Sequence, residues 1–310
     1  MAVVEPRRIL MTGASGFVGR HLMHALQTSF AGVEIFAYRV EVTNRDAIAR
    51  AVRDARPDVC IHLAAITSVM AAKDDPDRAW RVNLHGTLNL ARALLDLAPG
   101  CHLVFASSAE IYGESFRDGL PLDETALLAP MNSYAATKAA ADLTLGAMAG
   151  GGLRVVRLRL FNHTGPGQSE AFVAPAFALQ IAQIEAGRQA PPLRVGALDI
   201  LRDFLDVRDV CRAYIAAIRQ AAELPPGIVL NIASGVPRRI GDILDELLEM
   251  AGLRVEVVTD DKRLRSSEII SATGNADRAR QLLRWTSNIS WTQTLGDVLS
   301  DWRARVAASS

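Results

Sequence analysis

The stretch Arg8–Gly19, RILMTGASGFVG, decides the fold expected of this chain. Its first five residues are mostly aliphatic and predict a strand, and Phe17 opens a segment whose apolar residues recur at helical spacing. Between the two, Gly13, Gly16 and Gly19 allow a tight turn, close approach of the backbone to a pyrophosphate, and close packing of helix on strand. The stretch therefore predicts a strand–turn–helix unit that binds a dinucleotide.

Short β-branched runs alternate with longer segments of helical period downstream of this unit. Such alternation requires crossover connections, which produce a parallel sheet covered by helices on both faces. The expected fold class is therefore α/β, with a doubly wound parallel sheet of the Rossmann type. The expected strands are Arg8–Thr12, Ile35–Tyr38, Val59–Leu63, Leu103–Ala106 and Leu153–Leu160, and the expected helices are Phe17–Thr28, Arg45–Ala55, Asp77–Leu97 and Ser133–Met148.

The pattern loosens after about residue 160. Gly and Pro interrupt FNHTGPGQ, and the residues up to about 205 predict a helix at Ala174–Ala186 among short strands and loops. A helix at Val207–Ala221 and a strand at Ile228–Ile232 resemble the earlier units, so we expect the chain to return to the sheet there. Three further helices are expected near Gly241–Met250, Asp277–Leu283 and Thr292–Arg305.

Two domains are expected from this organisation. The first is a dinucleotide-binding Rossmann domain made of residues 1–165 plus about 205–235. The second is a smaller, discontinuous α/β lobe of about 166–204 and 236–310, which we expect to bind the substrate.

Composition limits the classes of partner. With 34 basic and 34 acidic residues among 310, the formal net charge is zero, so we expect neither nucleic acid nor an anionic membrane surface as a partner. No apolar run reaches the ~18 residues that span a bilayer, and the three cysteines lie far apart without metal-ligand spacing. We therefore expect a cytoplasmic protein with no metal site.

The choice of cofactor depends on the residues just after the second expected strand. NAD sites usually place an acidic residue about 20 residues past the glycines, whereas NADP sites place an arginine near the 2′-phosphate. Arg39 lies at the tip of this strand, so NADP(H) is preferred and NAD(H) remains possible. The candidate cofactor-binding residues are Gly13, Gly16, Phe17, Val18, Gly19, Arg39, Glu41, Val42, Leu63, Ala64, Ala65, Tyr134 and Lys138, with Glu41 and Val42 placed to contact the adenine.

Tyr134 and Lys138, in SYAATK, lie four residues apart on an expected helix and project from one face. The chain has only four tyrosines and three lysines, so this pair is rare by chance. An ammonium beside a phenol stabilises the phenolate, so we expect a lowered pKa for Tyr134 and a tyrosine that exchanges protons. Ser108 follows the strand Leu103–Ala106 and is placed to hydrogen-bond a substrate carbonyl. Together the three residues predict an enzyme.

Motifs along nearly the whole chain resemble those of the extended short-chain dehydrogenase/reductases that act on nucleotide-sugars. They are GASGFVG, IHLAA, NLHGTLNL, SSAEIYG, SYAATK, LRDFLDVRDV and TGNADRARQLLRW. The segments RLRLFNHTGPGQ, FVAPAFALQIA and RDFLDVRDVCRAY are most similar to GDP-4-keto-6-deoxymannose reductases, which make GDP-D-rhamnose. The resemblance implies that Tyr134 protonates the C4 oxygen as the nicotinamide delivers hydride to C4. It further implies that Ser108 polarises the carbonyl and that Lys138 binds the nicotinamide ribose while tuning Tyr134.

The same resemblance implies a site for a nucleotide-diphosphate sugar, with a GDP-sugar favoured. Asn162 and Arg202 would contact the sugar diphosphate, and Arg265 and Glu268 would hold diphosphate and ribose, which suits guanidinium and carboxylate chemistry. It also implies a homodimer paired through the helices at 77–97 and 133–148. The candidate substrate-binding residues are Ser108, Ala109, Glu110, Asn162, Val173, Arg202, Arg265 and Glu268.

Glu110 leaves a second reaction open. In sugar-nucleotide 4,6-dehydratases a glutamate at the matching position acts as the base at C5, so a dehydratase, or a 4-epimerase with recycled cofactor, is the alternative. The reductase is favoured because FNHTGPGQ resembles reductases more than GDP-mannose dehydratases, with GDP-D-rhamnose or its C4 epimer GDP-6-deoxytalose as product. A non-catalytic dinucleotide-binding regulator is disfavoured by the intact catalytic set. His163 is expected to make a local hydrogen bond and not to touch substrate.

Overall fold

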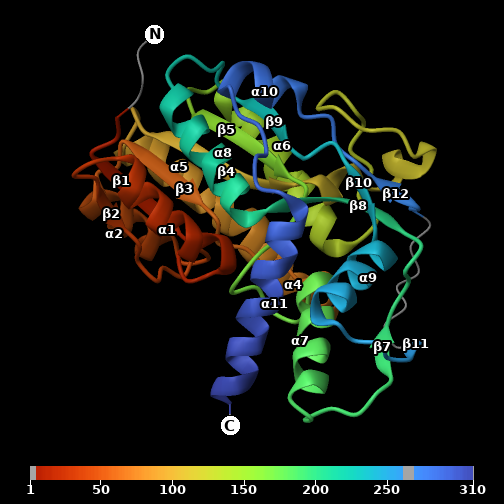
Figure 1. Cartoon of the computed structure of the whole chain (residues 1–310). Helices are drawn as coiled ribbons and strands as arrows, with labels where there is room; N and C mark the ends of the chain where they lie inside the picture. The colour runs from red at the N-terminus through yellow and green to blue at the C-terminus, as the bar shows by residue number, and fades with distance from the viewer. Residues whose placement is uncertain (1–4, 261–268, 310) are drawn as a thin grey trace.

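A six-stranded parallel sheet forms the centre of the protein (Figure 1). The computed structural model describes residues 5–260 and 269–309. Neighbouring strands in the order β2-β1-β3-β4-β5-β9 all pair in parallel, so the doubly wound α/β fold expected from the sequence is confirmed. The strands are β1 (Arg8–Thr12), β2 (Glu34–Phe36), β3 (Val59–His62), β4 (His102–Ser108), β5 (Arg154–Leu160) and β9 (Ile228–Ile232).

The strand order determines where a ligand binds. From β1 the chain crosses to β2 on one side, and then returns to β3 on the other side of β1. Connections therefore leave the carboxyl ends of β1 and β3 in opposite directions, which opens a crevice between them. The glycine-rich turn after β1 lies at this crevice.

Helices cover both faces of the sheet because alternate strand residues are apolar on both sides. Ile9 and Met11 pack with α1 (Phe17–Ser29) and α8 (Val207–Gln220) in one core. Leu10, between them, packs in a second core on the opposite face. That second core takes its helical residues from α2 (Arg45–Ala55), α5 (Thr87–Leu97) and α6 (Ser133–Ala149).

The long helix expected over Asp77–Leu97 is helical throughout, but it is not one regular α-helix. It consists of α4 (Pro76–Trp80), a π-helical segment η1 (Arg81–Gly86) and α5, and is preceded by α3 (Val69–Asp74). A second irregular element, the 3₁₀ segment η2 (Ala109–Asp118), follows β4 where the sequence predicts only a loop.

A smaller part of the molecule is built around a second sheet, in which β8 (Leu201–Asp206) pairs with β10 (Pro237–Arg239), β12 (Ser271–Ala272) and β6 (Asn162–Thr164). β7 (Leu193–Val195) pairs with β11 (Val257–Thr259). Figure 1 shows α7, α9 and α11 gathered below β8, β10 and β12, and their apolar residues form a third core. The helices are α7 (Val173–Glu185), α9 (Ile240–Ala251) and α11 (Trp291–Ala308), while α10 (Asp277–Leu283) packs on α8. Across the described residues, no helix is both long and apolar enough to cross a bilayer.

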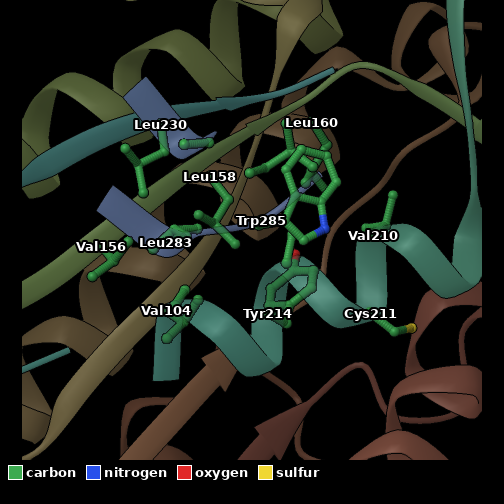
Figure 2. Packing of buried hydrophobic residues seen from close by; sticks show 14 of the residues in the cluster. Val104, Val156, Leu158, Leu160, Val210, Cys211, Tyr214, Leu230, Leu283 and Trp285 are labelled. Atoms are coloured by element: carbon green, nitrogen blue, oxygen red, sulfur yellow. The ribbon is translucent and has the colours of Figure 1, made fainter. Parts of the chain in front are cut away.

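Tyr214 lies in the core between α8 and the sheet. Figure 2 shows its ring close to Trp285 among aliphatic side chains of β4, β5 and β9. The indole of Trp285 donates a hydrogen bond to the Asp209 carbonyl at 2.9 Å, but the Tyr214 hydroxyl is buried and finds no hydrogen-bond partner among the described residues. Burial also raises the pKa of this phenol.

The unpaired hydroxyl predicts an unusual response to mutation. Because Tyr214→Phe removes a desolvated polar group and keeps the ring, we expect the variant to be as stable as the parent, or more stable by about 1 kcal/mol. Tyr112→Phe is the matched control, since that hydroxyl donates to Asn231 Oδ1 at 2.7 Å and accepts from Arg159 Nη1 at 2.9 Å. Its loss costs about 1–3 kcal/mol. Urea unfolding measures both; equal losses would contradict the assignment.

Candidate active site

The turn between β1 and α1 is shaped for a close ligand. Gly13 has φ +74°, and a Cβ there would lie 2.6 Å from the backbone nitrogen of Ala64. A Cβ on Gly19 would lie 2.5 Å from the carbonyl oxygens of Gly13 and Ala14. Helix α1 starts after Gly16 with no capping side chain and no acidic residue in its first turn, so its N–H groups and positive dipole end suit an anion. These residues fit the pyrophosphate of a dinucleotide.

A buried hydrogen-bonded chain fixes the opposite wall of the crevice, at the end of β3. The Thr12 hydroxyl donates to His62 Nδ1 at 2.6 Å, and His62 Nε2 donates to Thr87 Oγ1 at 2.9 Å, because that hydroxyl itself donates to the Asn83 carbonyl. Burial, and to a smaller extent the charge of Lys138, lowers the pKa of His62 to about 3, so the ring is neutral. Thr12 in turn accepts hydrogen bonds from the N–H groups of Leu63 and Ala64, which holds these two candidate cofactor residues beside Gly13. The third candidate, Ala65, follows them in the sequence.

Asn83 was not singled out in the sequence, yet it links this wall to the helix that carries Tyr134. Its Oδ1 accepts from the Ile66 backbone N–H at 2.8 Å, and its Nδ2 donates to the Ile66 carbonyl and to Thr137 Oγ1 at 3.0 Å. Asn83 is 1 % exposed, but the polar residues around it in RVNLHG give no sign in the sequence that it is buried. Thr12 and His62 are likewise single polar residues, each at the end of a buried strand, and the sequence does not show that they contact each other.

The candidate adenine-side residues lie beyond the end of β2. Arg39 is exposed and lines a hollow of about 210 Å³ together with Arg50 of α2. The Glu41 carboxylate accepts from the Thr43 hydroxyl at 2.8 Å and from its N–H, and these bonds lower the pKa of Glu41. The Val42 side chain is buried against Gly86, where a Cβ would lie 2.6 Å from Val42 Cγ2.

Ser108 and Tyr134 meet where β4 ends and α6 begins. Ser108 caps η2 by accepting from the Glu110 N–H at 3.2 Å, and its hydroxyl hydrogen-bonds the Tyr134 phenol. Tyr134 is the second residue of α6, whose start is fixed by Asn132 Oδ1 accepting from the Ala135 N–H at 2.8 Å. The structure therefore brings two of the three candidate catalytic side chains into contact.

Lys138 corrects one expectation. Its ammonium does not lie against the phenol: it donates to the Ala106 carbonyl and lies 4.2 Å from the centre of the Phe105 ring. The expected lowering of the Tyr134 pKa is wrong, because burial raises that pKa to about 12, the Ser108 hydrogen bond opposes this, and the charge of Glu110 adds to it. The phenol therefore holds its proton at neutral pH.

The charges of Glu110, on η2, and Arg202, on β8, act on each other. Glu110 is exposed and raises the pKa of Tyr134, and its charge also opposes the lowering that burial imposes on the pKa of Arg202. The Arg202 guanidinium donates to the Leu201 carbonyl at 2.7 Å and to the Ile269 carbonyl at 3.3 Å. The charge of Glu110 thus acts both on the Tyr134 phenol and on the Arg202 guanidinium.

The remaining candidates lie around this centre or outside the described residues. Ala109 is buried at the start of η2, Asn162 opens β6 opposite Phe204, and Val173 opens α7. Arg265 and Glu268 lie outside the described residues. His163 makes a local hydrogen bond, as expected, donating from Nδ1 to the Phe161 carbonyl at 2.9 Å.

A Rossmann sheet with a glycine-rich turn at its switch point and a Ser–Tyr–Lys set beside it defines a short-chain dehydrogenase/reductase. The model of the NAD dependent epimerase/dehydratase family matches residues 9–233. A GDP-6-deoxy-D-mannose reductase from Pseudomonas aeruginosa is 37 % identical over 304 residues, 97 % of this chain and 98 % of that protein. A GDP-6-deoxy-D-talose 4-dehydrogenase from Aggregatibacter actinomycetemcomitans is 28 % identical over 282 residues, 89 % of this chain and 91 % of that protein.

The fold comparison agrees. The structure of RMD from Pseudomonas aeruginosa complexed with NADPH superposes with a TM-score of 0.89 at 34 % identity, covering 96 % of this chain and 99 % of that one. The chain belongs to the NAD dependent epimerase/dehydratase family. It is an NAD(P)-dependent enzyme of the extended short-chain dehydrogenase/reductase type.

The close packing of Gly19 predicts a cofactor-binding defect. In Gly19→Ala the new methyl meets backbone oxygens that cannot rotate away, so the turn must shift, at a cost of about 1–3 kcal/mol. We expect NADPH and NADH to bind about tenfold more weakly, measured by nicotinamide fluorescence. Gly296→Ala is the matched control, because that helical glycine in α11 has open space around it. Unchanged binding in Gly19→Ala would contradict the fit.

Proposed function

We propose that this enzyme reduces the C4 ketone of a GDP-linked 4-keto-6-deoxyhexose, GDP-4-keto-6-deoxy-D-mannose above all. The product would be GDP-D-rhamnose, or GDP-6-deoxytalose if hydride arrives from the other face. Support comes from the 37 % identity to a GDP-6-deoxy-D-mannose reductase over nearly the full length of both chains. The 28 % identical relative is named as a 4-dehydrogenase of another GDP-linked 6-deoxyhexose, GDP-6-deoxy-D-talose.

The state of Tyr134 is compatible with reduction. Burial and Glu110 hold the pKa of its phenol at about 12, so the group is a proton donor at neutral pH. Reduction of a ketone needs a proton donor at this position, and the buried phenol supplies one.

The roles of the individual groups follow from their contacts. When bound, the reduced nicotinamide supplies a hydride to C4. The Ser108 hydroxyl, already paired with the phenol, would hydrogen-bond the carbonyl oxygen, and Tyr134 would transfer its proton to that oxygen as negative charge develops. Lys138 would bind the ribose next to the nicotinamide by donating hydrogen bonds from its ammonium. Arg202 would pair with a phosphate of the substrate.

We propose NADPH as the preferred reductant, with NADH as a weaker substitute. An arginine, not a carboxylate, follows β2 at position 39, and a second arginine lines the same hollow from α2. Guanidinium groups suit the 2′-phosphate that distinguishes the two cofactors. The structurally similar RMD was solved with NADPH.

Glu110 supports one competing function. Its exposed carboxylate beside Tyr134 could serve as a base at C5, as a 4,6-dehydratase requires. Such an enzyme, like a 4-epimerase, returns its nicotinamide to the starting redox state in each turnover. The two functions therefore differ in whether cofactor is consumed.

An assay with a defined ketone tests the proposal. With GDP-4-keto-6-deoxy-D-mannose we expect one NADPH to be oxidised for each sugar reduced, and NADH to be consumed more slowly. The loss of absorbance of the reduced nicotinamide measures both rates. Tyr134→Phe should lose turnover while binding NADPH, because it removes the proton and keeps the ring. Conversion of GDP-mannose without added reductant would instead identify a dehydratase.

We also propose that the substrate's nucleotide lies in the lobe made of about 166–204 and 236–310, and that the protein is a homodimer. Trp80 on α4, Leu97 on α5 and Leu143 on α6 are large apolar side chains exposed on neighbouring helices. Burying that face against a second copy would remove it from water. Sedimentation should give twice the monomer mass, reduced to the monomer by Leu143→Glu; a monomeric parent would contradict the dimer.

A further inference from the structure

The catalytic helix has a third polar residue in series with the two already described. Tyr134, Lys138 and Asp142 follow one another at four-residue intervals along α6, so they share one face. Asp142 is completely buried. Its Oδ2 accepts from the Ser107 hydroxyl at 2.6 Å, and its Oδ1 accepts from Arg157 Nη1 at 2.8 Å. One carboxylate therefore joins α6 to both β4 and β5.

The bond to Ser107 bears directly on the reacting groups. Ser107 precedes Ser108 in β4, and Asp142 lies one turn beyond Lys138 in α6. The 2.6 Å hydrogen bond from Ser107 to Asp142 fixes the position of α6 along β4. The contact of Ser108 with Tyr134 joins the same strand to the same helix, so a shift of α6 at Asp142 would move the Tyr134 hydroxyl away from the Ser108 hydroxyl.

Asp142 is also the negative charge within a cluster of buried cations. Besides Arg157, it pairs with Arg159, whose Nη2 and Nε lie 3.1 and 3.4 Å from its carboxylate oxygens. Arg159 in turn donates to the Tyr112 hydroxyl. The polar groups that face Lys138 or this carboxylate are His62 of β3, Ser107 and the Ala106 carbonyl of β4, and Arg157 and Arg159 of β5.

We propose that Asp142 is a positioning residue for the reduction: its buried carboxylate holds the helix of Tyr134 and Lys138 in register with the strand of Ser108, and supplies the negative charge that keeps Lys138 an ammonium. The inference rests on the proposed function, since it assigns a task to Asp142 within that reaction.

The pH dependence follows from the charges. Burial lowers the pKa of Lys138 to about 7, and the charge of Asp142 opposes that lowering. Lys138 assists as an ammonium, so activity is present below this pKa and falls as the pH rises through it. Removing the negative charge lowers the pKa further, and activity then falls at a lower pH.

The lysine content offers a direct readout that needs no substrate. Only Lys73, Lys138 and Lys262 occur in the chain, so protein labelled with ¹³C at lysine Cε gives three signals, assigned with Lys73→Arg and Lys262→Arg. We expect the Lys138 signal of the full chain to titrate near pH 7, and to titrate about 1 unit lower in Asp142→Asn. Asp142→Glu keeps the charge and should restore the parent midpoint. An unmoved midpoint in Asp142→Asn would overturn the electrostatic part of the proposal.

Asp206→Asn is the matched control for loss of a buried carboxylate. Asp206 is 3 % exposed, caps α8 and pairs with Arg208 at 2.7 Å. It therefore reproduces the loss of an arginine-paired aspartate away from the catalytic helix. We expect reduced stability and an unchanged Lys138 midpoint; an equal downward shift would show that the effect of Asp142→Asn is not specific.

Ser107→Ala tests the positioning part, and also serves if Asp142→Asn does not fold. It removes the bond to β4 and keeps the charge, so we expect kcat to fall about tenfold, with NADPH affinity and the Lys138 midpoint unchanged. An unchanged kcat would overturn this part. If the parent does not reduce the keto-sugar, the proposed function fails while the titration still decides the charge relation.

Discussion

Four hydrogen bonds to one buried carboxylate link the main sheet of this protein to the sheet built around β8. Asp203, on β8, accepts from the N–H and hydroxyl of Ser234 at 2.8 and 2.6 Å, and from the N–H groups of Gly235 and Gly274 at 2.9 and 3.2 Å. Ser234 and Gly235 follow β9 of the main sheet, and Gly274 follows β12 of the second. Burial raises the pKa of Asp203 although these donors oppose it, so the carboxylate is stabilised by its partners and not by water. The same hydrogen bonds fix β8, which also carries Arg202.

The sequence predicts most of the main sheet because its strands and helices carry their own periodic signal. Ile228–Ile232 is an example, since it occurs late in the chain and still matches the strand that pairs with β5. The second sheet gives no such signal. β6, β10 and β12 have two or three residues each, and pair only because β8 lies between them. Strands that short are decided by long-range contacts, which no local pattern encodes.

The sequence likewise predicts one part of the candidate site and not the other. Spacing alone predicts that Tyr134 and Lys138 share a face of one helix, and chain order places Ser108 near them. The direction of the Lys138 ammonium could not be predicted, because it depends on the Ala106 carbonyl and the Phe105 ring of a different element. The Tyr134 pKa differs from expectation for the same reason: burial and a carboxylate on η2 outweigh a lysine on its own helix. A formal net charge of zero conceals this local cluster of buried charges.

The π-helical segment between α4 and α5 changes the phase of the helix. Residues seven apart lie on the same side of a regular α-helix, yet Trp80 is 37 % exposed and Thr87 only 1 %. The wider turns of Arg81–Gly86 rotate the second half relative to the first. The helix running from α4 to α5 therefore exposes the Trp80 side chain before the π-helical segment and directs the Thr87 hydroxyl inward, toward His62, directly after it. A straight α-helix of the same sequence could satisfy the surface or the interior here, but not both.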